Sequence, residues 1–408
     1  MHRLATALVL ALAIMNTAHA DTLYAPWDNG PPNDPAYFPI GVWLQDPGRA
    51  DDYADIGVNV YIGLWAGPTE QQLTALQAAG MHAITSQNAY TRSLVEAGDP
   101  LADVIVAWMQ QDEPDNAQAA EGGGWGPPVT PEQIRERYEA MREIDPTRPI
   151  YLNLGQGVAW NGWHGRGVRT NEPGDYLGYQ RGADILSFDI YPAAANPREG
   201  AIAGQIWRVA YGTQRLRDWT DDDKPVWAIL EGSDIHGHGK ATAQQLRAEA
   251  WMAVIHGATG ITYFVHSWNR GGEMISEHAL LNDDELRPAA RDINATLTAL
   301  APVIHSPSIE DRLDVLITDG ERHDDIRAEY RVEPVAAMLK EHDGALYLFT
   351  VRTRDSDATA RFTIAGLEGT HDAEVIGEDR TVTLEDGSFE QTFNAWDTHL
   401  YRIPIDEP

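Results

Sequence analysis

Two glutamates, each at the end of an apolar run, have the clearest capacity for chemistry in this chain. Apolar residues give way abruptly to polar and acidic ones in VIVAWMQQDEPD (Val104 to Asp115), which contains Glu113. The same design recurs in PVWAILEGSD (Pro225 to Asp234), where Glu231 is followed by a glycine that lets the chain turn. Such runs are typical of buried parallel strands, and each would deliver its acid to the open end of the strand.

Paired strand-end carboxylates favour glycoside hydrolysis. Two carboxyl groups about 5 to 5.5 Å apart act as acid/base and nucleophile in retaining enzymes, whereas a gap of ~6.5 to 9.5 Å admits the attacking water of inverting enzymes. We expect Glu113 and Glu231 to converge on one mouth, because catalytic residues of parallel barrels lie at the carboxyl ends of the strands.

The elements that would position these acids alternate between strand-like and helix-like segments. The expected strands are Phe38 to Leu44, Val58 to Trp65, His82 to Gln87, the run before Glu113, Pro149 to Gly157, Ile185 to Ala194, Pro225 to Asp234 and Gly260 to Trp268. The expected helices are Asp51 to Ile56, Thr69 to Ala79, Thr130 to Ile144, Ala201 to Trp219, Thr242 to His256 and Glu285 to Leu300. A Gly- and Pro-rich loop is expected from Glu121 to Val129.

Eight strand–helix units in series predict a closed (β/α)8 TIM barrel, because parallel neighbours need crossover connections and a closed sheet has no edge. An open doubly wound sheet is the alternative. It is disfavoured because Trp43-Leu44-Gln45-Asp46 stands where a Gly-rich phosphate loop would follow the first strand.

After about Arg312 the pattern changes to short alternating runs with Asp-Gly hairpin signals at Asp343 and Asp386, which predict a small antiparallel β-sandwich. We therefore expect a barrel over residues 21–305 and a C-terminal domain over 306–408.

Residues 1–20 resemble a cleavable signal peptide: Arg3 precedes an apolar run, and Ala18-His19-Ala20 fits the cleavage pattern.

Composition narrows the partners and the compartment. The 408 residues carry a net charge of -32, which disfavours nucleic acid and anionic membrane surfaces, although adaptation to salt would explain the same balance. There is no cysteine, so disulfides and thiolate metal sites are excluded. With the signal peptide, this predicts a protein of the periplasm or the exterior; the sequence makes no prediction of oligomeric state.

The fourth- and seventh-strand glutamates in a secreted barrel with a trailing β-domain resemble the large clan of retaining (β/α)8 glycoside hydrolases, known as clan A, over Phe38 to Leu300. The resemblance implies that Glu113 is the acid/base and Glu231 the nucleophile, with no cofactor. The clan usually has Asn before the acid/base, where this chain has Asp112. A carboxylate there accepts a hydrogen bond but cannot donate one, and its charge would help to keep Glu113 protonated.

Other strand ends supply candidate substrate-binding residues. The clan often places a tyrosine at the sixth strand and a tryptophan at the eighth, so the resemblance implies substrate contacts for Tyr191 and Trp268, with Asp189 and His266 beside them. Structural roles in the core remain alternatives for all four. Further candidates at strand ends are Trp43, Trp65, Asn153 and Gln156.

The loop AWNGWHGRGVRT (Ala159 to Thr170) is unusually aromatic. Trp160 and Trp163 could stack on sugar rings, whose C–H faces suit the negative face of an aromatic ring. Arg166 and Arg169 suggest a uronate or sulfate on the substrate, and local ion pairs with surplus acids are the alternative.

Past Glu231 lie His236 and His238, which are weak evidence for a metal site because they stand alone on a Gly-rich loop. We therefore expect no metal.

The sequence predicts a secreted retaining glycoside hydrolase that cleaves a polysaccharide or oligosaccharide. The alternatives are a catalytically inactive carbohydrate-binding protein on the same scaffold and a metal-dependent hydrolase.

Overall fold

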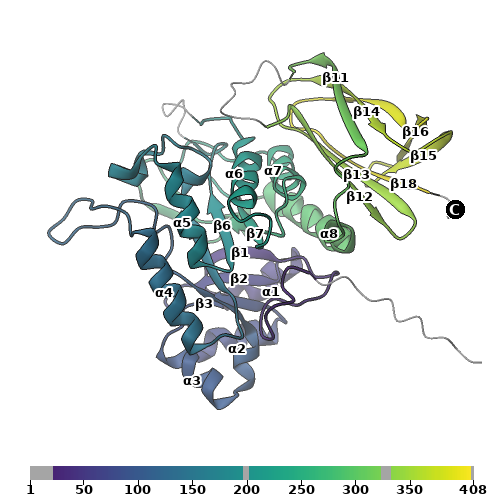
Figure 1. The fold of residues 1–408 in the computed structure, drawn as a ribbon. Coiled ribbons are helices and arrows are strands. Elements are labelled where there is room, and N and C mark those ends of the chain that lie inside the picture. The colour runs from purple at the N-terminus through teal and green to yellow at the C-terminus, as the bar shows by residue number, and fades with distance from the viewer. Residues whose placement is uncertain (1–21, 196–201, 323–331, 406–408) are drawn as a thin grey trace, which may run out of the picture.

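The computed structural model describes residues 22–195, 202–322 and 332–405. The expected signal peptide therefore lies outside the described residues. Within them the chain forms a barrel surrounded by helices, followed by an antiparallel domain beside α7 and α8 (Figure 1).

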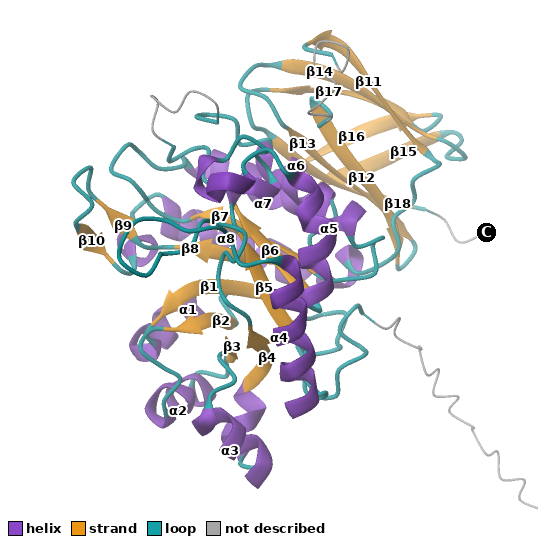
Figure 2. Ribbon diagram, turned by 60° about the vertical axis from the view of Figure 1, so that its left-hand side comes forward, coloured by secondary structure: helices purple, strands orange, loops and turns teal. Residues whose placement is uncertain are grey.

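Eight parallel strands close the barrel, which confirms the predicted (β/α)8 fold. Neighbours pair in chain order, and β1 pairs with β8 through Ile40 and Ile261 to close the ring. Figure 2 shows the strands inside a layer of helices. The strands are β1 (Ile40–Gln45), β2 (Val60–Leu64), β3 (His82–Thr85), β4 (Ile105–Met109), β5 (Ile150–Leu154), β6 (Ile185–Asp189), β7 (Val226–Glu231) and β8 (Gly260–Phe264). A short hairpin, β9 (Ser267–Trp268) with β10 (Met274–Ser276), follows β8.

The helices are α1 (Ala50–Asp55), α2 (Glu70–Ala78), α3 (Ala89–Ala97), α4 (Pro131–Ile144), α5 (Tyr176–Tyr179), α6 (Arg208–Trp219), α7 (Ala243–Ile255) and α8 (Leu286–Ile304). Reciprocal capping boxes start α2, α3, α4 and α7, where the side chain of Thr69, Asn88, Thr130 or Thr242 bonds the amide three residues on. The sequence analysis did not predict α3 or α5.

Alternate residues of each strand face two different cores, as the twofold period of a strand requires. One set, which includes Ile62, Ile84, Val106 and Ile229, fills the barrel interior. The other set packs outward against the helices. The N-terminal segment closes the amino end of the barrel, because the hydroxyl of Tyr24 donates to the carbonyl of Thr259 (3.0 Å) and accepts from Trp227 Nε1 (2.8 Å).

The C-terminal domain is one antiparallel sheet in the order β11-β14-β17-β16-β15-β18-β13-β12, folded around its own apolar core. Its strands are β11 (Leu313–Gly320), β12 (Val335–His342), β13 (Ala345–Arg352), β14 (Ala358–Ile364), β15 (Thr370–Val375), β16 (Arg380–Glu385), β17 (Ser388–Phe393) and β18 (Thr398–Pro404). The predicted antiparallel β-domain is thus confirmed. The two end strands of the sheet, β11 and β12, are both lined by apolar residues.

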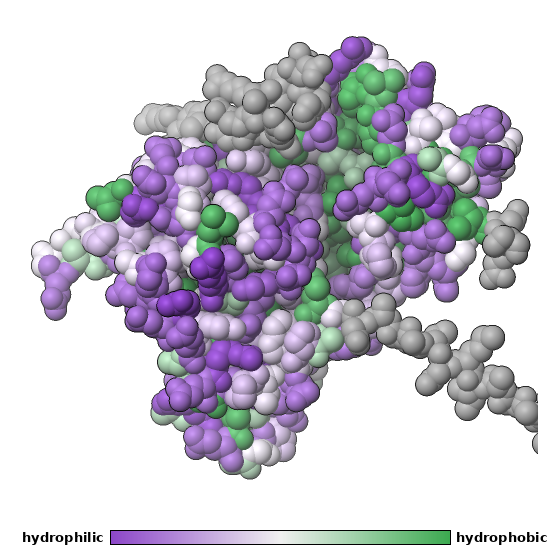
Figure 3. Space-filling model, in the orientation of Figure 1, coloured by the Kyte–Doolittle hydropathy of each residue, from purple (hydrophilic) through white to green (hydrophobic). Residues whose placement is uncertain are grey.

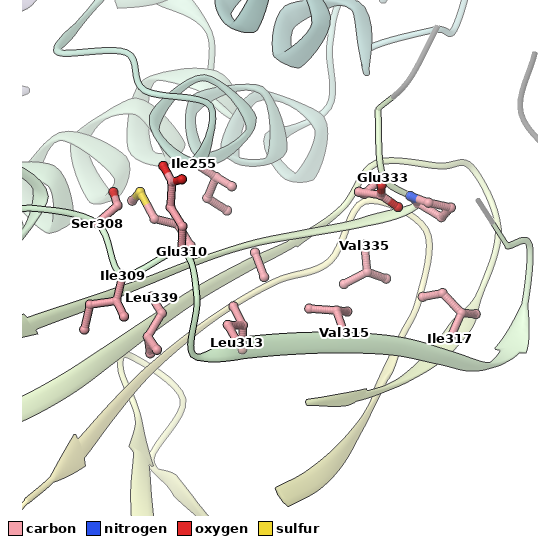
Figure 4. Close-up of a pocket in the computed structure, with 13 residues that line it drawn as sticks. Ile255, Ser308, Ile309, Glu310, Leu313, Val315, Ile317, Glu333, Val335 and Leu339 are labelled. Atoms are coloured by element: carbon pink, nitrogen blue, oxygen red, sulfur yellow. The ribbon is translucent and has the colours of Figure 1, made fainter. Parts of the chain in front are cut away.

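A groove of about 450 Å³ runs between these end strands and reaches α7. Leu313, Val315 and Ile317 of β11 face Val335 and Leu339 of β12 across it (Figure 4). Apolar residues gather on this domain in Figure 3, whereas the visible face of the barrel is mainly hydrophilic. The lining of the groove includes two acids, Glu310 and Glu333, which lie near its opposite ends. The groove therefore lacks the cluster of polar groups that a catalytic site has.

The two domains share an apolar interface on α7. Trp251 packs on Phe349 of β13 with ring centroids 5.1 Å apart, and both belong to the cluster that covers the outside of the barrel strands. The side chain of Gln244 donates to the carbonyl of Ala395 (2.9 Å) and to Asp397 Oδ1 (2.8 Å). No helix in the described part of the chain is both long and apolar enough to cross a membrane.

Candidate active site

Acidic side chains gather at the carboxyl ends of β4, β5 and β6. Asn153, near the end of β5, links them: its Nδ2 donates to Asp112 Oδ1 at 3.0 Å, and its Oδ1 accepts from Ser187 Oγ at 2.7 Å. Because one amide is held at both ends, the segment after β4 is fixed relative to β6. Asn153 is 2% exposed and acts here as a bridge between strands.

The main chain at Glu113 adopts an uncommon conformation. Its φ of 41° lies in the left-handed region, which non-glycine residues rarely occupy and which is enriched at functional sites. The amide of Glu113 donates to the carbonyl of Asn153 at 3.1 Å and so holds this turn against β5. Gly155 makes room beside it: a Cβ at that residue would lie 2.9 Å from Glu113 Oε1.

The carboxyl groups of Glu113 and Asp189 are hydrogen-bonded to each other. Burial raises the pKa of Glu113 well above its usual value, and the charges of Asp189 and Asp112 raise it further. Burial also raises the pKa of Asp189 to about 7, although the hydrogen bonds from Tyr191 and Glu113 oppose the shift. Since two adjacent buried carboxylates cannot both ionise cheaply, the pair holds one proton near neutral pH, with Glu113 as the donor.

Asp112 and Asp115 flank Glu113. Loss of solvent around the Asp112 carboxylate raises its pKa to about 6, and the hydrogen bond from Asn153 opposes this shift. The residue as a whole is exposed at the surface. Asp115 is fully buried and accepts from the amide of Gly155 (2.9 Å) and the hydroxyl of Tyr176 (2.7 Å). It therefore anchors the turn that carries Glu113.

A cavity of about 580 Å³ opens beside Glu113. Indole rings from two loops line it: Trp163 lies before the 3-10 helix His164–Arg169, and Trp125 is 79% exposed on the Gly-rich loop after β4. Trp163 Nε1 donates to Asn116 Oδ1 at 2.8 Å, which fixes that ring. The remaining side chains of the lining are those of Asp112, Asn116, Ala117, Gln118 and His164. Acids, amides and aromatic rings together suit a sugar, which presents hydroxyls at its edge and C–H bonds on its face.

Glu231 does not face this cavity, contrary to the expectation that it would meet Glu113 at the mouth. It is the last residue of β7 and is 0% exposed. Its Oε1 and Oε2 accept from the amides of Ala193 (2.7 Å) and Ala194 (2.6 Å). The structure thus pairs Glu113 with Asp189.

Arg166 and Arg169 are engaged in ion pairs within their own loop, which agrees with the alternative to the expected recognition of an anionic sugar. Arg166, 1% exposed, contacts Asp175 Oδ2 at 2.7 Å and lies over the ring of Tyr176. Arg169 contacts both carboxylate oxygens of the same Asp175. Both cations are therefore occupied by local acids.

The other predicted binding residues are divided among several places. Trp268 stacks on Phe264 with ring centroids 6.0 Å apart, and the rings of His266 (5.3 Å) and Tyr191 (5.2 Å) also pack against Phe264. This row of rings lies outside the lining of the cavity beside Glu113.

Trp43 is buried in the barrel interior, and Trp65 is half-exposed after β2. Trp160 packs against Trp163 with ring centroids 5.4 Å apart. Gln156 has a buried Oε1 without a hydrogen-bond partner among the described residues. None of these four lines the cavity.

The residues between 22 and 405 that the structure describes include no group of three or more His, Cys, Asp and Glu side chains arranged to hold a metal ion. The loop that carries His236 and His238 is instead fixed by Asp234, whose Oδ1 accepts from the amide of His238 at 3.0 Å.

Four residues of these sites were not predicted from the sequence: Trp125, Asn116, Asp115 and Glu249. Trp125 was hidden in a stretch whose Gly and Pro content predicts only a loop. Glu249 had a usable signal, because it is a single acid within the apolar run Ala248 to Val254, and an acid in that setting is buried and needs a partner.

Comparisons with known proteins bear on the fold. No protein-family model matches the chain, and no curated protein does. A solved structure described as a glycoside hydrolase aligns with 93% of this chain and 98% of its own at 12% identity, with a TM-score of 0.53. A putative alpha-galactosidase from Bacteroides fragilis aligns with 91% of this chain and 80% of its own at 13% identity, with a TM-score of 0.52. The resemblance to glycoside hydrolases is thus confirmed as a likeness of fold that extends over both domains.

Proposed function

We propose that this protein is a glycoside hydrolase that cleaves a polysaccharide or oligosaccharide. The observation that carries the proposal is that the carboxyl groups of Glu113 and Asp189 adjoin each other and that Glu113 lines a cavity together with two tryptophans, with Asp189 just outside that lining. A neutral carboxylic acid next to an ionised carboxylate is the combination that glycoside hydrolysis requires.

In the proposed reaction, Asp189 attacks the anomeric carbon while Glu113 donates its proton to the departing glycosidic oxygen. The bond from carbon to the leaving oxygen breaks as the bond from carbon to Asp189 forms. Glu113, now ionised, takes a proton from water, and the resulting hydroxide attacks the same carbon. This step releases the sugar, restores the Asp189 carboxylate and returns the proton to Glu113.

Contact between the two carboxyl groups favours retention of configuration. Inverting enzymes hold theirs about 6.5 to 9.5 Å apart to admit a water, which is wider than any pair in hydrogen-bond contact. Entry of a sugar would part Glu113 and Asp189 toward the retaining separation. This keeps the expected double displacement and replaces Glu231 with Asp189 as the attacking group.

The lining favours a neutral glycan. Apart from His164 it contains no basic side chain, and Arg166 and Arg169 are held by Asp175. A uronate would meet Asp112 and Glu113 without a counter-charge. We also retain the proposal, from the N-terminal sequence, that the enzyme is exported and meets its substrate in the periplasm or outside the cell.

The test is a screen of purified mature protein against neutral and anionic polysaccharides, with product anomers followed by NMR. We expect activity on a neutral glycan with retained configuration. Glu113→Gln and Asp189→Asn should each lower kcat by about 10²- to 10⁴-fold, because each removes a group that acts in the transition state. Trp65→Ala, which alters a tryptophan outside the cavity, is the control; full activity of Glu113→Gln would overturn the proposal.

A carbohydrate-binding protein without catalysis is the second candidate. Two observations favour it: Asp112 replaces the asparagine usual in the clan, and Glu231, the acid at the strand position of the nucleophile, is sealed from solvent. Calorimetric binding of oligosaccharides by a protein that releases no product would select this function.

A further inference from the structure

Glu231 and Glu249 form a second buried acid pair behind the candidate site. Both are 0% exposed, and Glu249 reaches the end of β7 from the middle of α7. The side chains are hydrogen-bonded to each other, and Glu249 Oε2 also accepts from the amide of Glu231 at 3.4 Å. This pair is separate from Glu113 and Asp189, yet Glu231 ends the strand next to β6.

The hydrogen bonds made by Glu231 and Glu249 indicate which of the two is ionised and which is protonated. Glu231 accepts from two main-chain amides at 2.7 and 2.6 Å, which stabilise the ionised form. Glu249 Oε1 has no hydrogen-bond partner among the described residues, and two ions so close in an apolar setting would repel. Glu249 is therefore the neutral member and donates its proton to Glu231.

The amides held by Glu231 belong to the loop that orients Asp189. Ala193 and Ala194 follow Tyr191 and Pro192, directly after β6. Tyr191 donates its hydroxyl to Asp189 Oδ2 at 2.7 Å. A continuous series of contacts thus runs from Glu231 through the main chain to Tyr191 and on to Asp189.

We propose that Glu231 is a positioning residue, which fixes the loop of residues 191–194 and through it the orientation of Asp189 toward Glu113. The kinetic part rests on the proposed function. The anchoring part does not, because it concerns only the loop. A nucleophilic role is disfavoured since neither carboxylate oxygen is open to a substrate: each already accepts a short bond from an amide.

Hydrogen exchange of the full chain tests the anchoring without any substrate. In wild type, the amides of Ala193 and Ala194 should be strongly protected. Glu231→Gln turns one oxygen into an NH2 group that faces an amide donor, so protection at these two residues should fall about 10- to 100-fold, the equivalent of one buried hydrogen bond. Glu249→Gln keeps a donor toward Glu231 and should leave protection within about threefold. Glu136→Gln on the exposed face of α4 is the matched control.

Kinetics on the glycan found by the screen supply the second readout. Glu231→Gln should lower kcat about 10-fold with little change in KM, because the tryptophan cavity is intact while Asp189 is no longer oriented. If Glu231→Gln does not fold, Glu231→Asp is the second variant, because its side chain is one methylene shorter and holds the carboxylate farther from the two amides. It should show the same faster hydrogen exchange at Ala193 and Ala194 and the same fall in kcat.

Unchanged protection at Ala193 and Ala194 in the Glu231 variants would overturn the proposal, and so would lost protection with unchanged kcat. Recovery of Glu231→Ala turnover by added azide, which replaces a missing nucleophile, would instead assign the attack to Glu231. If wild type cleaves no glycan, the proposed function fails, and the exchange measurement still decides whether Glu231 anchors the loop.

Discussion

Glu113 and Asp189 hydrogen-bond to each other through their carboxyl groups, so one proton lies between the turn after β4 and the end of β6. Neighbouring groups set how tightly each acid holds it. Asp112 acts on both by charge, and Tyr191 acts on Asp189 by a hydrogen bond. Substitutions at these two neighbours should therefore move the titration of the pair in opposite directions.

Asp112→Asn should move the pH–activity profile to lower pH. The negative charge of Asp112 raises the pKa of both Glu113 and Asp189, and an asparagine removes that charge while its oxygen still accepts from Asn153. Both limbs of kcat/KM against pH should shift downward. A profile that stays in place, or moves upward, would contradict the assignment of the two limbs to this pair.

Tyr191→Phe should move the low-pH limb upward. The hydroxyl of Tyr191 stabilises ionised Asp189 and lowers its pKa, so its removal means that Asp189 ionises only at higher pH. We also expect kcat at neutral pH to fall about fivefold, the value of one hydrogen bond. Tyr138→Phe is the control, because its hydroxyl donates to Asp184 at 2.8 Å elsewhere; equal profiles for the two variants would count against the role of Tyr191.

The protein should be more stable at mildly acidic than at alkaline pH. Burial raises the pKa of Asp189 and that of Glu231 to about 7 each, above the usual values of 3.8 for Asp and 4.5 for Glu. An acid whose pKa is higher in the native protein than in the unfolded chain stabilises the native state fully at a pH below its pKa in the unfolded chain. This stabilisation is lost as the pH rises through its pKa in the native protein. Between about pH 5 and pH 8 the two buried acids together should lower the free energy of unfolding by on the order of 5 kcal/mol, since each loses about two units at 1.4 kcal/mol per unit.

Urea titrations at several pH values measure this slope, and Asp189→Asn should make it shallower. An increase in stability over the same interval would show that these acids are not raised in the native protein.

Trp125→Ala should raise KM about fivefold without changing stability. The ring is 79% exposed, so it contributes little to folding, while one sugar–aromatic stack is worth about 1 kcal/mol. Steady-state kinetics compare this variant with Trp65→Ala, which removes a half-exposed tryptophan outside the cavity. The same KM in both variants would place the substrate elsewhere.

Arg166→Ala should destabilise the protein by about 1 to 3 kcal/mol, because it leaves the carbonyls of Asp115 and Glu172 without their donor, while Asp175 keeps its ion pair with Arg169. Arg169→Ala should change stability much less than Arg166→Ala does, since that arginine is largely exposed and its ion pair is screened by solvent. Thermal unfolding measures both. If instead Arg166→Ala folds normally and loses affinity for an anionic glycan, the idea of a charged substrate returns.

The barrel could be predicted from the sequence because each strand is a short apolar run followed by polar residues. Helix α3 could not: its segment AYTRSLVEA buries little besides Thr91 and Leu94, and its start depends on a cap from Asn88. The same change from apolar to polar residues predicted that Glu113 follows the fourth strand, and in the structure it lies in the turn after β4. The orientation of Glu231 depends on Ala193, Ala194 and Glu249, which are brought together only by packing, so its position in the sequence gave no sign of its burial.

Helix α7 joins the two halves of the molecule. It carries Glu249 toward β7, and the same helix presents Trp251 to Phe349 of the C-terminal sheet. Cutting the chain after Ile304 would leave that tryptophan exposed to water on the helix that supports the end of β7. A truncated barrel is therefore expected to be less stable than the whole chain, so functional assays should use both regions together.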